Sequence, residues 1–275
     1  MVYKKFIDEL RAAGIIEPER ELSELICFAY GIDKTTLYRE GVDFLEHADI
    51  NRLKAYVQMR KKRQPLQYIV GEVEFYGLTL KVSTGVLIPR PETELMVHEA
   101  ALYLQNKPLR KALDLCTGSG CIALSLAKHF PNARFYATDI SQMAISSSIL
   151  NKQVNNVQNV YFLLGNLFSP LKPAVFDLII SNPPYIKTVD ISNLQPEIRI
   201  YEPTEALDGG KDGLDYYKKI IEGASNGFLS PDGILILEIG SGQADDILDI
   251  AVSYGFKHIY FKKDYSGIER IAFIS

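Results

Sequence analysis

The chain has 275 residues, of which 47% are hydrophobic and 23% are charged, so it can bury one large α/β core and a smaller one. A formal net charge of −4 argues against a protein that coats nucleic acid non-specifically, because that binding needs a strong positive field. Three cysteines give no disulfide framework, four scattered histidines give no metal-ligand spacing, and no apolar run suits a signal peptide or a membrane span. These features predict a cytoplasmic protein with reduced thiols and no metal.

Residues 1–65 are predicted to form a small N-terminal helical bundle. Apolar residues recur there at spacings of three and four. Breaks in the pattern fall at Gly14, Pro18, Gly31 and Gly41, and Asp33 is a candidate helix cap. The basic run Arg60-Lys61-Lys62-Arg63 adjoins a helical pattern and predicts a solvated helix end rather than a grip on phosphate.

Residues 66–90 are predicted to form a β-hairpin linker. Aromatic and β-branched runs at 68–71, 75–78 and 80–82 are punctuated by glycine. Next comes Leu87-Ile88-Pro89-Arg90-Pro91-Glu92-Thr93-Glu94, in which two prolines around an arginine keep the backbone extended. Its acidic residues begin an apolar-periodic helix.

Residues 91–275 are predicted to form the catalytic domain, because strands and helices alternate from residue 111 onward. Strands are expected at 112–115, 134–138, 160–164, 176–180, 233–239, 257–261 and 270–274. Helices are expected near 120–129, 141–151, 214–228 and 243–254. This pattern predicts a Rossmann-like α/β fold with a seven-stranded, mostly parallel sheet. The last two strands have no helix between them, so the final strand is expected to be antiparallel.

A glycine loop closes the first of these strands. In Asp114-Leu115-Cys116-Thr117-Gly118-Ser119-Gly120, glycines let the backbone approach a ligand, and the following helix offers free amide hydrogens. Asp139 follows Gly118 by 21 residues, at the end of the second strand, where an acid can bind both hydroxyls of a ribose. The arrangement predicts a nucleotide-binding site.

The motif Asn182-Pro183-Pro184-Tyr185 directly follows the apolar strand at 176–180. Neither proline has an amide hydrogen, so the chain must leave the sheet at its carboxyl edge, where open α/β sheets bind ligands. The Asn182 side-chain oxygen and the Pro183 carbonyl can accept both hydrogens of a planar NH2 group, and Tyr185 can stack on that group. A plain strand-ending turn would explain one proline and the asparagine, but not all four residues in this order.

Two cofactors compete for the glycine loop. Gly118-Ser119-Gly120-Cys121-Ile122-Ala123 fits the dinucleotide pattern of a nicotinamide-dependent oxidoreductase. Against that, Asp114 is placed to reach the methionine part of S-adenosylmethionine, and Asn182 could present an amide or amine nitrogen to a methyl donor. The sequence therefore favours a class I S-adenosylmethionine-dependent methyltransferase, while a protein that binds the cofactor without chemistry is a further alternative.

These motifs, together with five further runs, resemble one family, the peptide-chain release factor glutamine N5-methyltransferases. The further runs are 65–71, 86–94, Glu202-Pro203, 206–214 and 264–270. The resemblance implies methylation of the glutamine amide in the Gly-Gly-Gln tripeptide of class I release factors, with S-adenosylmethionine as donor and S-adenosylhomocysteine as product. It also implies that the N-terminal helices help to grip the release factor.

The resemblance assigns site residues to three roles. Catalysis falls to Asn182, Pro183 and Tyr185. Cofactor binding falls to Asp114, Cys116, Thr117, Gly118, Ser119, Gly120, Asp139, Asn166, Leu167 and Asn182. Substrate binding falls to Asn182, Pro183, Pro184, Tyr185, Arg90 and Glu92.

Two positions depart from the pattern of the family. Cys116 stands where a glycine is common, and its small side chain is tolerable if its φ is negative. Asn166 stands where an acid usually meets the adenine, and its amide can both accept from and donate to that base. We expect a monomer that needs no nucleic acid and no membrane. The alternative substrates are a glutamine of another protein, such as a ribosomal protein, and a nucleic-acid amine.

Overall fold

A computed structural model describes residues 2–41, 50–172 and 174–275. The chain divides into two compact units, Met1–Glu72 with Gln195–Tyr201, and Val73–Leu194 with Glu202–Ser275. We call them unit 1 and unit 2, and each is described by itself. Residues 42–49 of the predicted helical bundle lie outside the described residues. None of the described helices is long and apolar enough to cross a membrane.

Unit 1 is helical in its described part, as the spacing of apolar residues predicts. Its helices are α1 (Val2–Ala12), α2 (Pro18–Tyr30), α3 (Lys34–Glu40), α4 (Ile50–Lys61), α5 (Leu66–Val70) and α9 (Pro196–Tyr201). Leu10, Leu25 and Leu53 are fully buried in its core. Asp33 caps α3, because its carboxylate accepts a hydrogen bond of 2.8 Å from the Thr36 amide.

The prediction of a hairpin that includes residues 68–71 is wrong, because Leu66–Val70 forms helix α5. Leu66 and Ile69, three residues apart, share one helix face and are both buried in the core of unit 1. The hairpin follows as β1 (Glu72–Phe75) and β2 (Leu78–Lys81). Unit 1 accordingly extends to Glu72, beyond the predicted boundary at residue 65.

Helix α9 belongs to unit 1 although more than a hundred residues separate it from the other helices. The Glu197 carboxylate accepts from Nε and Nη2 of Arg63, both at 2.6 Å, and lies 3.0 Å from Nη1 of Arg60. Arg60 also pairs with Glu21 and is only 5% exposed. The expectation of a solvated helix end is therefore wrong for Arg60, because a charge can be buried when it is paired with carboxylates.

Unit 2 contains the predicted α/β sheet. Its strands are β3 (Lys111–Leu115), β4 (Arg134–Asp139), β5 (Val160–Leu164), β6 (Phe176–Ser181), β7 (Leu229–Glu238), β8 (Ile259–Lys263) and β9 (Glu269–Ile274). They form a seven-stranded sheet in the order β5-β4-β3-β6-β7-β9-β8. Strand β9 is antiparallel to β7 and β8, while the pairs from β5 to β7 are parallel. The predicted fold class is confirmed.

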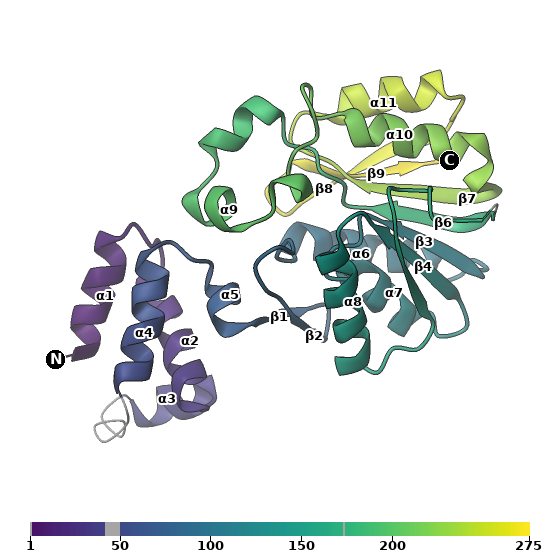
Figure 1. Cartoon of the computed structure of the whole chain (residues 1–275). Helices are drawn as coiled ribbons and strands as arrows, with labels where there is room; N and C mark the ends of the chain where they lie inside the picture. The colour runs from purple at the N-terminus through teal and green to yellow at the C-terminus, as the bar shows by residue number, and fades with distance from the viewer. Residues whose placement is uncertain (1, 42–49, 173) are drawn as a thin grey trace. The chain divides into compact units, whose positions relative to one another are not determined.

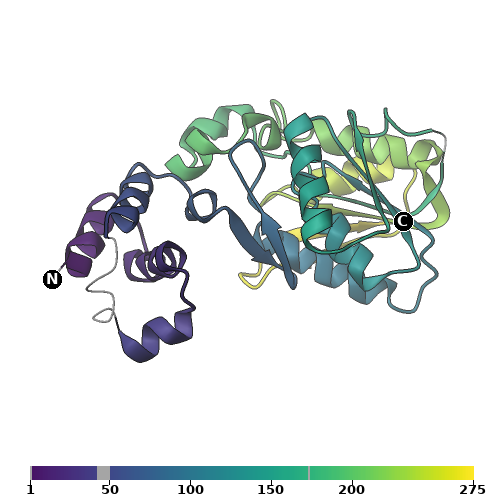
Figure 2. The same cartoon turned by 60° about the horizontal axis from the view of Figure 1, so that its bottom comes forward.

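Helices cover both faces of this sheet (Figures 1 and 2). One face carries α6 (Pro91–Leu104), α7 (Cys121–His129) and α8 (Gln142–Val154), and the other carries α10 (Asp215–Gly223) and α11 (Ala244–Ser253). Because strand side chains alternate, Ile180 of β6 packs in the core under α6 and α7, while Ile179 packs under α10 and α11. Burial on both faces explains why the predicted strands are mostly apolar rather than alternating.

The strand order reverses direction at β3. From β3 the chain moves outward through β4 to β5, and then returns to β6 on the other side of β3. Loops that leave neighbouring strands toward opposite faces open a crevice at the carboxyl edge, which is where such sheets bind ligands. The glycine loop after β3, Asp139 at the end of β4 and Asn182 after β6 all lie at this edge.

Candidate active site

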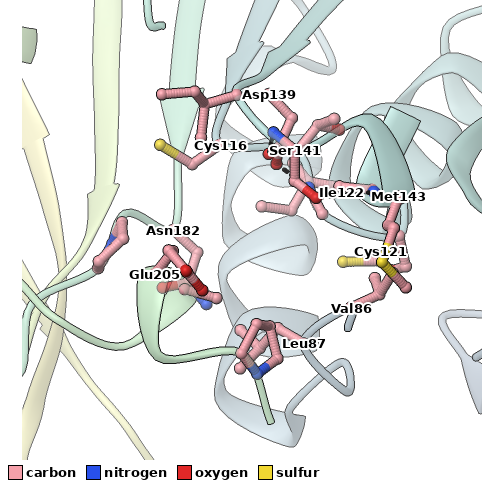
Figure 3. A pocket seen from close by; sticks show the side chains of 18 of the residues that line it. Val86, Leu87, Cys116, Cys121, Ile122, Asp139, Ser141, Met143, Asn182 and Glu205 are labelled. Atoms are coloured by element: carbon pink, nitrogen blue, oxygen red, sulfur yellow. Dashed lines mark hydrogen bonds between the residues drawn. The ribbon is translucent and has the colours of Figure 1, made fainter. Parts of the chain in front are cut away.

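A cavity of about 570 Å³ lies at the carboxyl edge of the sheet in unit 2. This volume is in the range of sites that hold cofactors and small ligands. The predicted residues that line it are Arg90, Cys116, Thr117, Gly118, Ser119, Asp139, Asn166, Leu167, Asn182 and Pro184. Figure 3 shows Asn182 and Glu205 on one side of the cavity and Val86 and Met143 on the other.

Asp139 ties the glycine loop to the start of α8. Its Oδ2 accepts a hydrogen bond of 2.8 Å from the Gly118 amide, and its Oδ1 accepts one of 2.9 Å from the Ser141 amide. Burial raises the pKa of this carboxyl, and the two backbone bonds oppose that shift. Each carboxylate oxygen can accept a further bond, so Asp139 can still bind a ligand from the cavity.

Asp114 lies beneath the glycine loop and outside the cavity lining that the described residues form. Its Oδ2 accepts from the Thr117 hydroxyl at 2.6 Å and from the Ala123 amide at 3.2 Å. Within the described part of the chain, its Oδ1 has no hydrogen-bond partner, and burial raises the pKa of the carboxyl to about 7. A buried carboxylate oxygen without a donor is costly, so this atom is suited to a donor brought by a ligand.

Cys116 has a φ of 58°, so the condition under which a small side chain would be tolerated without strain, a negative φ, is not met. The loop must turn back from β3, and the next amide, that of Thr117, donates to the carbonyl of Thr138 on β4 at 3.0 Å. A left-handed backbone costs a residue other than glycine roughly 1–2 kcal/mol. Leu167, which lines the cavity beside Asn166, is left-handed as well, with a φ of 49°.

Asn182 is held by a hydroxyl from the first turn of α6. Its Nδ2 donates to the Thr93 Oγ1 at 3.0 Å, and Thr93 in turn donates to Oε2 of Glu238 at 2.6 Å. Strand β6 ends just before this point at Ser181, whose hydroxyl donates to the Leu115 carbonyl at 2.6 Å. The bond to Thr93 engages one N–H of the Asn182 Nδ2, and Oδ1 is the acceptor end of the same amide.

Tyr185 is the residue predicted to stack on the substrate amide. It lies outside the described cavity lining, and its hydroxyl makes a long hydrogen bond of 3.4 Å to Oε1 of Glu238. Its carbonyl accepts from Nε2 of Gln243 at 3.1 Å. In this structure Tyr185 therefore packs against the core, and its stacking on a substrate stays a prediction.

Three other predicted residues also lie outside that lining. Pro183 is buried behind the strand end, Gly120 caps α7 with a φ of 82°, and Glu92 occupies the first turn of α6. Arg90 does line the cavity, and its Nη2 lies 2.7 and 2.6 Å from the two oxygens of the buried Glu202. This pair fixes the guanidinium at the cavity wall.

The sequence reasoning missed Thr93, Glu238 and Glu205. Glu238 is 1% exposed and ends β7, and burial raises the pKa of its carboxyl to about 7. One signal could have found it, because an acid at the carboxyl end of a predicted strand is what singled out Asp139. Thr93 and Glu205 carried no such signal. In the part of the chain that the structure describes, no group of His, Cys, Asp and Glu is arranged to hold a metal ion.

Two family models match the chain. A model described as the methyltransferase small domain matches residues 93–210, and one described as the PrmC N-terminal domain matches residues 2–71. A release factor glutamine methyltransferase from Thermodesulfovibrio yellowstonii is 46% identical, over 92% of this chain and 90% of that protein. Another from Geobacter sulfurreducens is 41% identical, over 95% of this chain and 91% of its own length.

Two solved structures share the fold of much of this chain. A methyltransferase from Pyrococcus furiosus matches with a TM-score of 0.53 at 21% identity, over 82% of this chain and 98% of that chain. The N-terminal domain of human METTL16, in complex with SAH, matches with a TM-score of 0.53 at 18% identity, over 73% of this chain and 76% of its own. At these identities the likeness concerns the fold alone.

Proposed function

The chain belongs to the family of release factor glutamine methyltransferases, and on that premise we propose that its cavity methylates the side-chain amide nitrogen N5 of a glutamine in class I release factors. The enzyme is an S-adenosylmethionine-dependent methyltransferase that acts on glutamine of release factors. The target glutamine is proposed to be that of the tripeptide Gly-Gly-Gln, and specific residues are proposed to hold the methyl donor and the acceptor amide. Membership of a methyltransferase family argues against the alternative of a nicotinamide-dependent oxidoreductase.

The cavity residues fit S-adenosylmethionine, which supplies an electrophilic methyl group when it is bound. Asp139 has acceptor capacity left on both oxygens and would hold the ribose hydroxyls. Oδ1 of Asp114, which has no hydrogen-bond partner among the described residues, would receive the ammonium group of the methionine part. Gly118, with a φ of 56° and open space where a Cβ would stand, lets the loop backbone approach the ligand. Asn166 and Leu167 would contact the adenine.

The side-chain amide of the substrate glutamine, which accepts the methyl group, would be held by the residues that directly follow β6. Oδ1 of Asn182 and the carbonyl of Pro183 would accept the two N–H bonds of the glutamine side chain. An amide nitrogen is a poor nucleophile because its lone pair is delocalised into the carbonyl. Two acceptors align the nitrogen and favour the positive charge that develops on it, and each charge-assisted bond contributes roughly 1.5–3 kcal/mol. The proton on the methylated nitrogen is then acidic and can leave to an acceptor or to water.

The observation that carries this proposal is the bond from Nδ2 of Asn182 to Thr93 at 3.0 Å. It uses the donor end of the amide, so the acceptor end is left for the substrate. A reversed amide would direct its own NH2 group toward that of the glutamine, and two donors cannot pair.

The test is methyl transfer from S-adenosylmethionine to a purified release factor, read by mass spectrometry of the tryptic peptide. A release factor with alanine in place of the tripeptide glutamine should gain no methyl group. Asn182→Ala should reduce kcat at least about 10²-fold while S-adenosylmethionine affinity stays the same. The matched control is Asn193→Ala, since Asn193 is exposed and lies outside the cavity lining that the described residues form. Methylation of a ribosomal protein or a nucleic acid in preference to the release factor would overturn the proposal.

Unit 1 is proposed to recognise the body of the release factor. Its described residues include two strongly exposed apolar side chains, Ile16 at 84% and Tyr38 at 73%. Replacing both with serine should raise KM for the release factor without changing the affinity for S-adenosylmethionine. We further propose a monomer that works in the cytoplasm without nucleic acid, which sedimentation and nuclease treatment would check.

A further inference from the structure

The two polar side chains of the Asn-Pro-Pro-Tyr motif are linked by hydrogen bonds to one buried carboxylate, that of Glu238. Oε2 of Glu238 accepts from Thr93 at 2.6 Å, and the same Thr93 oxygen accepts from Nδ2 of Asn182 at 3.0 Å. Oε1 of Glu238 accepts from the Tyr185 hydroxyl at 3.4 Å. Glu238 and Thr93 are 1% and 2% exposed, so water does not compete for these bonds.

The direction of each bond depends on the charge of Glu238. An ionised carboxylate only accepts, so the Thr93 hydroxyl must donate to it and offers its lone pairs to Asn182. Tyr185 also donates, because burial raises the pKa of its phenol and keeps it protonated. The ionised state therefore fixes Asn182 with Nδ2 toward Thr93 and Oδ1 toward the cavity.

We propose that Glu238 is a positioning residue, which acts through Thr93 to hold Asn182 in its acceptor orientation and releases that hold when it is protonated. The inference rests on the proposed function, because the acceptor orientation matters only if Asn182 binds an NH2 group. A protonated Glu238 can donate its own O–H to Thr93. The Thr93 hydroxyl is then free to donate to Oδ1 of Asn182, and the amide can turn its NH2 group into the cavity.

The surroundings place this change of protonation near neutral pH. Burial, together with the charge of Glu92 on α6, raises the pKa of Glu238 to about 7. The hydrogen bonds from Thr93 and Tyr185 and the charge of Arg270 on β9 oppose that rise. Cys121 on α7 and Tyr217 on α10 also face the group, but both have raised pKa values and stay neutral. The Tyr217 hydroxyl donates to the Glu238 carbonyl at 3.0 Å, which leaves the carboxylate to Thr93 and Tyr185.

The experiment measures kcat for methylation of a release factor from pH 6 to pH 8, with both substrates saturating. The wild-type kcat should rise about tenfold over this interval, which is the ratio of the ionised fractions for a pKa of about 7. Glu238→Gln should lower kcat at pH 8 at least about tenfold and flatten the profile to less than about twofold. S-adenosylmethionine affinity, measured by calorimetry, should not change. Glu99→Gln is the matched control, because it removes a carboxylate of α6 that pairs with Lys262.

Substitutions at Thr93 keep the inference testable if Glu238→Gln does not fold. Thr93→Val removes the hydroxyl at constant shape and should reproduce the low, flat kcat, whereas Thr93→Ser should restore both rate and pH profile. If the two residues act as one chain, the double variant Thr93→Val with Glu238→Gln should be no slower than the slower single variant.

The outcomes separate the two hypotheses. A wild-type protein that methylates no release factor refutes the proposed function. A wild-type protein that does so, with Glu238→Gln retaining its kcat and pH profile, refutes the positioning role alone. Losses that multiply in the double variant would show that Thr93 and Glu238 act independently, and that result would also overturn the inference.

Discussion

Replacing Asp139 with alanine should weaken S-adenosylmethionine binding without unfolding unit 2. Its two oxygens accept backbone bonds of 2.8 Å from Gly118 and 2.9 Å from Ser141, so the carboxylate is held in place before any ligand arrives. A group that is already ordered loses little entropy when it binds. Its free acceptor capacity would go to the two ribose hydroxyls.

The expected loss follows from those two contacts. A hydrogen bond to a charged acceptor contributes roughly 1.5–3 kcal/mol, so two of them contribute about 3–6 kcal/mol. Since each 1.4 kcal/mol is a factor of ten, the dissociation constant should rise about 10²- to 10⁴-fold. The value at the low end applies if water takes the place of the lost carboxylate.

Calorimetry of S-adenosylmethionine binding measures this loss, and Asp177→Ala supplies a matched control. The Asp177 carboxylate also accepts two backbone bonds, 2.7 Å from Arg110 and 3.0 Å from Lys111, but at the opposite end of the sheet. Asp177→Ala should lose similar stability and keep its affinity. A dissociation constant for Asp139→Ala within about threefold of the wild type would refute the ribose role. Equal losses in both variants would show that stability, and not ribose binding, was measured.

Three further predictions concern Asp114, Cys116 and the N-terminal residues 1–72. Asp114 has a raised pKa of about 7, so its contribution to stability is complete below its unfolded pKa and is lost as pH rises through 7. Asp114→Asn should therefore raise the Tm of the ligand-free protein at pH 8 by at least about 2 °C, but not at pH 4. The same variant should bind S-adenosylmethionine more weakly. At the left-handed position 116, calorimetric or urea unfolding of Cys116→Gly should stay within about 1 kcal/mol of the wild type, whereas Cys116→Val should lose about 1–2 kcal/mol. Removing residues 1–72 should leave S-adenosylmethionine affinity unchanged in calorimetry, because all lining residues belong to unit 2, and should raise KM for the release factor in the methylation assay.

The sheet and the positions of its ligand motifs could be predicted from the sequence. Each strand of the parallel core is rich in apolar residues, and each is followed closely by glycine, proline or an acid at its carboxyl end. These signals lie within windows of five to ten residues, and the parallel topology then gathers the strand ends at one edge. Asp139, Asn182 and the glycine loop reach the same cavity for that reason.

The local sequence pattern gave wrong predictions where packing against another segment decided the backbone conformation. The run at 68–70 is rich in residues that favour strands, yet it is helical because Leu66 and Ile69 complete the core of unit 1. Cys116 is left-handed because the loop must turn from β3 toward β4, although no local residue signals that conformation.

The polar partners were decided by tertiary structure. Glu197 meets Arg63 across 134 residues, Asn182 meets Thr93 across 89, and Thr93 meets Glu238 across 145. A sequence shows that a carboxylate or an amide is present, but the partner of a buried polar group depends on which segments the strand order makes neighbours. The sequence thus determined where the proposed donor and acceptor sites lie, and only the packing of α6 and β7 beside β6 decided the bond that orients Asn182.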